Sequence, residues 1–262
     1  METRTICKNK LTFRVSVALH QRFWTKVEDG QWEPETFAVF DRYVNAATTY
    51  LDVGTWEGPT LLYAGQLAKA AYGFEPDPVA FAGLERNLAA NPEIQNIRIF
   101  NSCIAAETGE TQFGSRSGGG DTMSSLLFSE GQTVWTVPTI RLDEFVAREK
   151  LEAPLFIKID TEGGEYSILP SLDTFFRQYR PTIYLSTHPA FFGSVVPSLL
   201  GKIRAHFGLV FALRSFKYLY DTDGRRIRLW ELLLKKRWRE NASIIATHEL
   251  MRPQASGDSS TR

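Results

Sequence analysis

The chain has 262 residues, of which 43% are hydrophobic, and its 30 basic and 30 acidic side chains give a net charge of zero. This composition excludes disordered, collagen-like and coiled-coil proteins, and the length favours one large globular domain. No run of apolar residues approaches the ~18 that a membrane span needs, and the start of the chain has no signal-peptide pattern. Two cysteines are too few for a disulfide framework. We therefore expect a cytoplasmic protein without a membrane span.

The sequence predicts three parts. Residues 1–47 are expected to form a helical extension rich in aromatic residues, residues 48–251 the main domain, and residues 252–262 a disordered tail without apolar periodicity. In the extension, apolar spacing predicts a helix over Glu35–Asn45. Its aromatic side chains could border a ligand pocket, although core packing is their commoner use: Phe13, Phe23, Trp24, Trp32, Phe37 and Phe40.

From residue 49 onward, apolar strands alternate with amphipathic helices. The predicted strands are Thr49–Val53, Ala71–Glu75, Ile97–Ile104, Leu155–Asp160 and Pro181–Ser186, and the predicted helices between the first three are Thr60–Ala70 and Asp77–Ala90. This order predicts a doubly wound α/β fold, with a mostly parallel sheet covered by helices on both faces. Val210–Tyr220 and Ala242–Thr247 are also strand-like, and they could close the sheet as an antiparallel pair.

Basic residues are concentrated near the C-terminus, where residues 202–240 carry a net charge of +7. One interpretation is a protein without enzymatic activity that binds nucleic acid or another anionic polymer through this segment. The basic residues alternate with leucines and Trp230, which instead favours an amphipathic helix that packs on the domain or on a second subunit of a homodimer.

A glycine turn follows the first predicted strand, in the order Asp52-Val53-Gly54-Thr55-Trp56-Glu57-Gly58. The spacing is Gly-x-x-x-Gly, not the Gly-x-Gly-x-x-Gly that lies against a pyrophosphate, and Asp52 would repel a phosphate but attract an ammonium group. Glu75 ends the second predicted strand, where a carboxylate can accept both hydroxyls of a ribose. Asp77 is better suited to capping the next helix. These features predict S-adenosylmethionine as cofactor, with an NAD-linked oxidoreductase as the alternative.

These blocks resemble the FkbM-type S-adenosylmethionine-dependent methyltransferases. The matching residues, over roughly residues 48–190, are Asp52–Gly58, Phe74–Pro78, Asn87 with Asn91, Ser124–Leu126, Thr139–Phe145, Ile157–Glu165 and His188. The resemblance implies the class I methyltransferase fold and O-methylation of a hydroxyl, often of a sugar or glycan or of a natural product. Trp56 departs from the pattern, which more often has a small polar residue there.

The resemblance also implies where the cofactor is bound. The positions are Gly54, Thr55 and Gly58 in the loop, Glu75 with its neighbour Pro76 at the ribose, and Asn101 and Ser102 near the adenine. The ends of their strands independently place Asp52 and Asp160 at the same mouth. A mobile loop is expected over residues 115–125, and it could close as a lid over cofactor and acceptor.

Acidic residues and one histidine follow the fourth and fifth predicted strands. Asp160 and Glu162 come after one strand and His188 after the next, so they are expected at one edge of the sheet. His188 is the first candidate for the general base because its ordinary pKa is near neutral, and Asp160 or Glu162 could orient it or serve instead. Glu165 is as well explained by a helix N-terminus. The spacing matches no metal signature, so a divalent ion is the less favoured interpretation.

Overall fold

The computed structural model describes residues 2–17, 20–115, 133–189, 196, 198–233 and 240–251. The predicted tail at 252–262 and almost all of the predicted loop at 115–125 lie outside the described residues. None of the helices within these ranges has the length and apolar character to cross a membrane.

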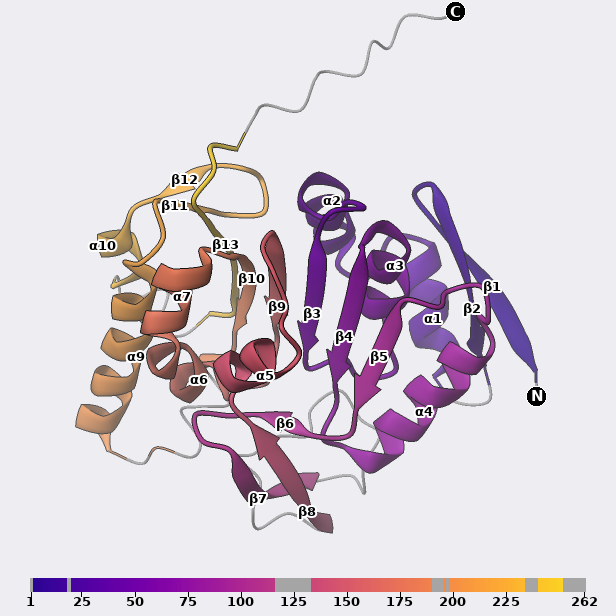
Figure 1. Ribbon diagram of the computed structural model, residues 1–262, viewed down its shortest axis with the longest axis horizontal. Helices are drawn as coiled ribbons and strands as arrows, with labels where there is room; N and C mark the ends of the chain where they lie inside the picture. Colours follow the sequence, from indigo (N-terminus) through magenta and orange to yellow (C-terminus); the bar gives the residue numbers. More distant parts are fainter. Residues whose placement is uncertain are drawn as a thin grey trace, which may run out of the picture.

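An eight-stranded sheet runs through the centre of the molecule (Figure 1). In spatial order its strands are β12 (Arg226–Ile227), β11 (Tyr218–Tyr220), β13 (Ala242–Thr247), β10 (Thr182–Thr187), β9 (Leu155–Ile159), β3 (Thr49–Val53), β4 (Ala70–Phe74) and β5 (Ile97–Phe100). The five strands from β10 to β5 are parallel, and β13, β11 and β12 add antiparallel pairs at one edge. The prediction of a doubly wound, mostly parallel sheet with antiparallel C-terminal strands is confirmed.

Helices cover both faces of this sheet. One face carries α1 (Gln21–Glu28), α2 (Pro34–Tyr43), α3 (Pro59–Leu67) and α4 (Pro78–Ala89), and the other carries α5 (Leu142–Arg148), α6 (Glu165–Ser171), α7 (Asp173–Tyr179), α9 (Leu199–Leu213) and α10 (Leu229–Leu232). Side chains of successive strand residues enter opposite cores, as with Tyr50 on the first face and Leu51 on the second. Apolar burial on both faces explains why the parallel strands are continuous apolar runs.

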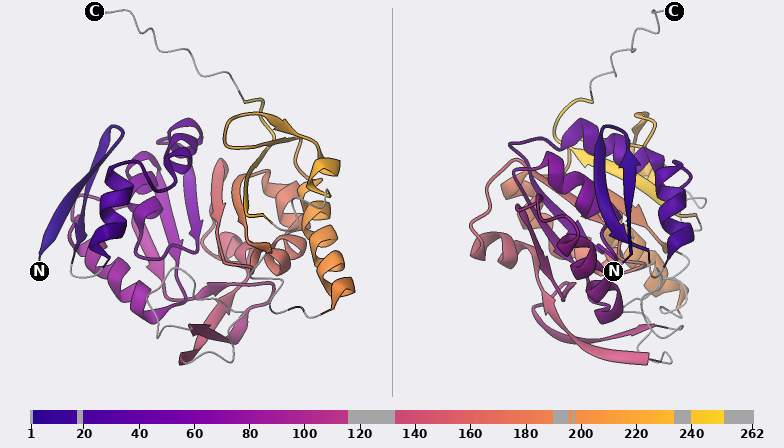
Figure 2. Two further views of the ribbon diagram at one scale, coloured as in Figure 1. Left: turned by 180° about the vertical axis from the view of Figure 1, so that it is seen from behind. Right: turned by 90° about the vertical axis from the view of Figure 1, so that its right-hand side faces the viewer.

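Two smaller sheets extend the main domain. At the N-terminus, β1 (Thr3–Lys8) and β2 (Leu11–Ser16) form an antiparallel hairpin beside α1, α3 and α4 (Figure 2). Beyond the carboxyl ends of the parallel strands lie β6 (Cys103–Ile104), β7 (Gly109–Ser115) and β8 (Thr133–Ile140). Neither the N-terminal hairpin nor the separate sheet of β6, β7 and β8 was predicted from the sequence.

Two predicted strands differ in the structure. The strand expected over Ile97–Ile104 breaks at Asn101 and Ser102, and its last two residues join the small sheet as β6. The strand expected over Val210–Tyr220 is wrong for its first half, because α9 continues to Leu213 and only β11 is extended. A buried face with helical spacing, which includes Leu209 and Leu213, outweighs the strand propensity of the local β-branched and aromatic residues.

Candidate functional site

A cavity of about 370 Å³ opens where β3, β4, β9 and β10 end. Strand order reverses between β3 and β9, which is the position where open parallel sheets bind ligands. Residues of the strand ends, the N-terminal segment and the small sheet line it: Phe23, Lys26, Trp32, Glu33, Val53, Gly54, Thr55, Trp56, Pro59, Thr60, Phe74, Glu75, Pro76, Cys103, Ile104, Phe113, Lys158, Asp160, Thr161, Glu162 and His188. Its volume lies within the ordinary range of small-molecule sites.

The turn after β3 requires glycine for a steric reason. Gly54 has φ of 85°, and a Cβ atom there would lie 1.9 Å from the backbone oxygen of Asp160. Gly58 has φ of 91°, and a Cβ atom would lie 2.6 Å from Leu84 of α4. Gly54 therefore lets two strand ends converge on the cavity, and Gly58 lets α3 begin close to α4.

A buried lysine links the ends of β3 and β9. Lys158 Nζ lies 3.5 Å from Asp52 Oδ1 and 3.2 Å from Asp160 Oδ2, and it donates a hydrogen bond of 3.3 Å to the Gly54 carbonyl. Burial disfavours the charged lysine, but the carboxylates outweigh it and hold the pKa of Lys158 above its usual value. Thr60 donates to the other oxygen of Asp52, at 2.7 Å. Asp52 itself is fully buried and does not line the cavity, so it acts by holding Lys158 and Thr60.

Glu75 is a buried carboxylate held by backbone groups. Its Oε2 accepts from the Trp56 amide at 2.7 Å, and its Oε1 accepts from the Asp77 amide at 2.8 Å. Burial raises its pKa to about 8 even though both amides favour the ionised form. Each carboxylate oxygen can accept a second hydrogen bond, so the two oxygens fit a ligand that presents two hydroxyl donors.

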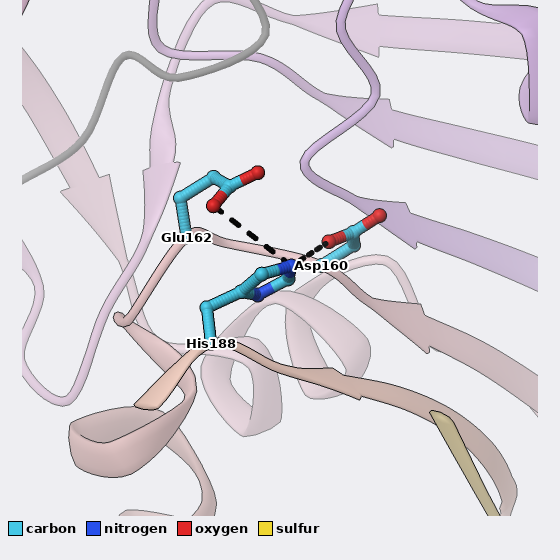
Figure 3. Close-up of side chains that lie close together, drawn as sticks. All are labelled: Asp160, Glu162 and His188. Carbon is cyan, nitrogen blue, oxygen red and sulfur yellow. Dashed lines mark ion pairs between the residues drawn. The ribbon is translucent and has the colours of Figure 1, made fainter. Parts of the chain in front are cut away.

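Asp160, Glu162 and His188 form the other polar end of the cavity (Figure 3). His188 Nε2 lies 3.6 Å from Asp160 Oδ1 and 3.8 Å from Glu162 Oε2. Behind the ring, the fully buried Glu165 accepts from the His188 backbone amide at 2.5 Å and from the Gly163 amide at 2.8 Å. Glu165 therefore ties the end of β10 to the loop after β9.

The carboxylates change the protonation of this cluster. Burial opposes the charged imidazole, but Glu165, Asp160 and Glu162 together raise the pKa of His188 to about 9. The sequence favoured His188 as the base because an ordinary histidine has a near-neutral pKa. With a pKa of about 9, His188 is protonated at neutral pH. Burial raises the pKa of Glu162 to about 7 despite the opposing effect of His188. Burial disfavours the charged form of Asp160 as well, but Lys158 and His188 hold its pKa below the usual value.

The same three side chains have the spacing of a possible cation site. One ligand atom from each of Asp160, Glu162 and His188 lies within 4.8 Å of the other two. In this arrangement the His188 imidazolium supplies one positive charge to the two carboxylates.

The structure brings most of the predicted site residues to one cavity. Asp52, Gly58, Asn101 and Ser102 do not line it, whereas seven others do: Gly54, Thr55, Glu75, Pro76, Asp160, Glu162 and His188. Asn101 donates from its side chain to the Glu75 and Pro76 carbonyls, at 2.8 and 3.3 Å, so it holds the backbone that carries Glu75. Asp77 accepts from the Val79 and Ala80 amides, which confirms that it caps α4.

The N-terminal segment and the small sheet also contribute residues that line the cavity, and these residues belong to no sequence motif. Of the six aromatic residues considered for a ligand pocket, Phe23 and Trp32 line the cavity, and the other four are buried in the core. Lys26, Glu33 and Phe113 also line it, and the sequence analysis did not select them. The density of aromatic residues was the only local signal for this wall.

Comparison with known proteins identifies the family. Residues 52–220 match the methyltransferase FkbM domain, which is more than half of the chain. None of the curated proteins compared with this chain matches it. Its structure is similar to many solved structures, and the three named here each have 16% identity or less and a TM-score below 0.5.

The first of these is methyltransferase FkbM from Methylobacillus flagellatus KT, with TM-score 0.41 and 16% identity over 59% of this chain and 39% of that one. The match thus spans well under half of the Methylobacillus chain. SMU.1697c from Streptococcus mutans, solved in complex with SAH, has TM-score 0.43 and 7% identity over 81% of this chain and 95% of that one. Precorrin-6y C5,15-methyltransferase from Geobacter metallireducens GS-15 has TM-score 0.40 and 12% identity over 83% of this chain and 90% of that one.

The family match, the sheet topology and the glycine turn agree. The cofactor of the family is S-adenosylmethionine, as predicted, and the NAD-linked alternative has no support. The chain therefore belongs to the S-adenosylmethionine-dependent methyltransferases of the FkbM family.

Proposed function

We propose that this protein transfers a methyl group to a hydroxyl oxygen of a small molecule, either a sugar or glycan or a natural product. The observation that carries the proposal is the cluster of Asp160, Glu162 and His188 on the wall of the cavity that also contains Glu75. An alcohol must lose its proton as the new C–O bond forms, and this cluster can take that proton.

The residues at the ribose end fit the nucleoside of the cofactor. Glu75 would accept both ribose hydroxyls, and the turn at Gly54 and Thr55 would pass beside the amino acid end. When bound, S-adenosylmethionine supplies a methyl group that is already activated on a sulfonium. The protein then has to align the acceptor oxygen with this methyl group, which can supply about 7–11 kcal/mol of the barrier reduction.

Glu162 is our candidate for the general base. Its pKa of about 7 places it near half ionisation at neutral pH, whereas His188 is protonated there and can only donate hydrogen bonds. Bound S-adenosylmethionine would supply the methyl group to the acceptor oxygen, and Glu162 would take the proton that the hydroxyl loses. The His188 imidazolium holds Glu162 and Asp160 in place.

The test is a panel of acceptors with methyl-labelled S-adenosylmethionine. Monosaccharides, glycosides and hydroxylated natural products would be compared with their amino and thiol analogues, and the methylated atom identified by mass spectrometry and NMR. We expect a methyl ether as the product. Its formation should be lost in Glu162→Gln but kept in the control Glu152→Gln, which changes an exposed carboxylate. Methylation on nitrogen or sulfur, or a methyl ether formed equally well by both variants, would contradict the proposal.

A further inference from the structure

The N-terminal segment contributes one wall of the cavity, although it precedes the family domain in the sequence. Phe23, Lys26, Trp32 and Glu33 all line it. The Phe23 ring packs against Trp56 in the turn after β3, with ring centroids 4.5 Å apart. This contact fixes the segment beside the loop that the cofactor uses.

Glu33 has an unusual backbone and an unusual use of its side chain. It occupies the N-cap position of α2 with φ of 39° and ψ of 52°, in the left-handed region that a residue with a Cβ atom enters only at a cost. Its side chain accepts no hydrogen bond from the amides of the first turn, in contrast to the side chain of Asp77 at the start of α4. Its Oε2 instead accepts from the Thr36 hydroxyl at 2.9 Å, and that hydroxyl lies 2.8 Å from the hydroxyl of Tyr184.

The charges near Glu33 favour a cation in the cavity. Lys158 acts on Glu33 as a positive charge, but the carboxylates of Asp52 and Asp160 already pair with it. Burial and the nearby Asp160 raise the pKa of Glu33, and a bound ammonium would lower it again. Lys26 brings a positive charge to the same wall. A wall with one carboxylate and one ammonium matches a ligand end that carries both charges.

We infer that the N-terminal segment recognises the amino acid end of the cofactor, with Glu33 binding the α-ammonium group and Lys26 the α-carboxylate. This inference rests on the cofactor of the family and not on the proposed hydroxyl acceptor. It gives the residues before the family domain a direct part in cofactor binding, at the end of the cavity where Trp56 departs from the family pattern.

Three ligands separate the two contacts. S-adenosylhomocysteine carries both charged groups, its decarboxylated analogue keeps only the ammonium, and 5′-methylthioadenosine has neither. Dissociation constants would be measured by calorimetry for the wild type, Glu33→Gln and Lys26→Gln. The matched controls are Glu35→Gln, in the first turn of α2, and Lys10→Gln, in the β1–β2 turn, neither of which lines the cavity.

We expect Glu33→Gln to raise the dissociation constants of S-adenosylhomocysteine and of its decarboxylated analogue by about 10- to 100-fold, the range for a lost charged hydrogen bond. Lys26→Gln should weaken only S-adenosylhomocysteine, and both controls should match the wild type. Binding of 5′-methylthioadenosine should stay within about threefold in every variant, which also reports an intact fold. A loss shared equally by all three ligands, or no loss for Glu33→Gln, would overturn the inference. Failure of the wild type to bind S-adenosylhomocysteine would overturn the cofactor assignment with it.

Discussion

The two polar ends of the cavity hold carboxylates in opposite ways. Glu75 is bound by two backbone amides, and no Lys, Arg or His in the described part of the chain forms an ion pair with it. Its pKa is raised to about 8. Asp160 also lines the cavity, but it lies between Lys158 and His188, and these two positive groups lower its pKa. Burial raises the pKa of a carboxyl group at both ends, so the neighbouring charges decide which carboxyl is ionised.

Under the proposed function, this difference assigns cofactor binding to one end of the cavity and proton transfer to the other. A carboxylate held by amides alone suits neutral hydroxyl donors, which add hydrogen bonds without adding charge. A cluster of carboxylates around an imidazolium suits proton transfer, because a member such as Glu162 titrates near neutral pH. Variants at the two ends should therefore affect different measurements.

The largest effect is expected from Glu162→Gln. Without the base, kcat should fall by about 10²–10⁴-fold, while the dissociation constant of S-adenosylhomocysteine stays close to that of the wild type. In the wild type, kcat should rise as pH increases through about 7, because Glu162 must be ionised to accept a proton. Rapid-quench kinetics on an acceptor from the panel measure the fall in kcat and its pH dependence, and calorimetry measures the dissociation constant. An equal loss of cofactor affinity would show that the two ends are not separate.

Glu75→Gln should have the converse effect. Replacement of the carboxylate weakens two bonds to the ribose and disturbs the amides of Trp56 and Asp77, so S-adenosylhomocysteine should bind about 10²-fold more weakly. At saturating cofactor, kcat should stay within about tenfold of the wild type. Calorimetry and saturation kinetics give the two values. A variant that binds normally would remove Glu75 from the ribose site.

His188→Asn tests the charge balance of the chemical end through stability. The folded-state pKa of His188 is raised to about 9, above its unfolded value, so its stabilisation is complete below pH 6.5 and is lost as pH rises through about 9. We expect the variant to lose roughly 2 kcal/mol of unfolding free energy at pH 6, and less at pH 9.5. Urea unfolding at both pH values measures this. A loss that does not change with pH would indicate packing alone.

The smallest effect concerns the pH dependence of cofactor binding. If the ribose requires ionised Glu75, whose pKa is about 8 without ligand, affinity for S-adenosylhomocysteine should increase up to about tenfold between pH 7 and 9. Binding should release a proton, which calorimetry in buffers of different ionisation enthalpy detects. Glu75→Gln should abolish this proton release, and its persistence in that variant would assign the proton to another group.

The order of strands and the cofactor turn could be predicted from the sequence because their signals are local. β3 and β13 have the predicted bounds, and Asp77 caps α4 as expected. These features depend on apolar periodicity, glycine spacing and one capping residue, all of which are read over a few neighbouring positions. Two features were not predicted: the break of the third strand at Asn101 and Ser102, and the helix that continues to Leu213. Both depend on packing partners far along the chain.

The sequence by itself determined the α/β class, the family and the set of strand-end residues, because the carboxyl ends of parallel strands must meet at one edge of the sheet. Only the tertiary structure decided the protonation of that set. Glu165, Asp160 and Glu162 surround His188 and raise its pKa, and this depends on distances between two loops that the chain order leaves open. The tertiary structure also decided which residues form the N-terminal wall, because Lys26 and Glu33 belong to no motif and reach the cavity through the packing of α1 and α2.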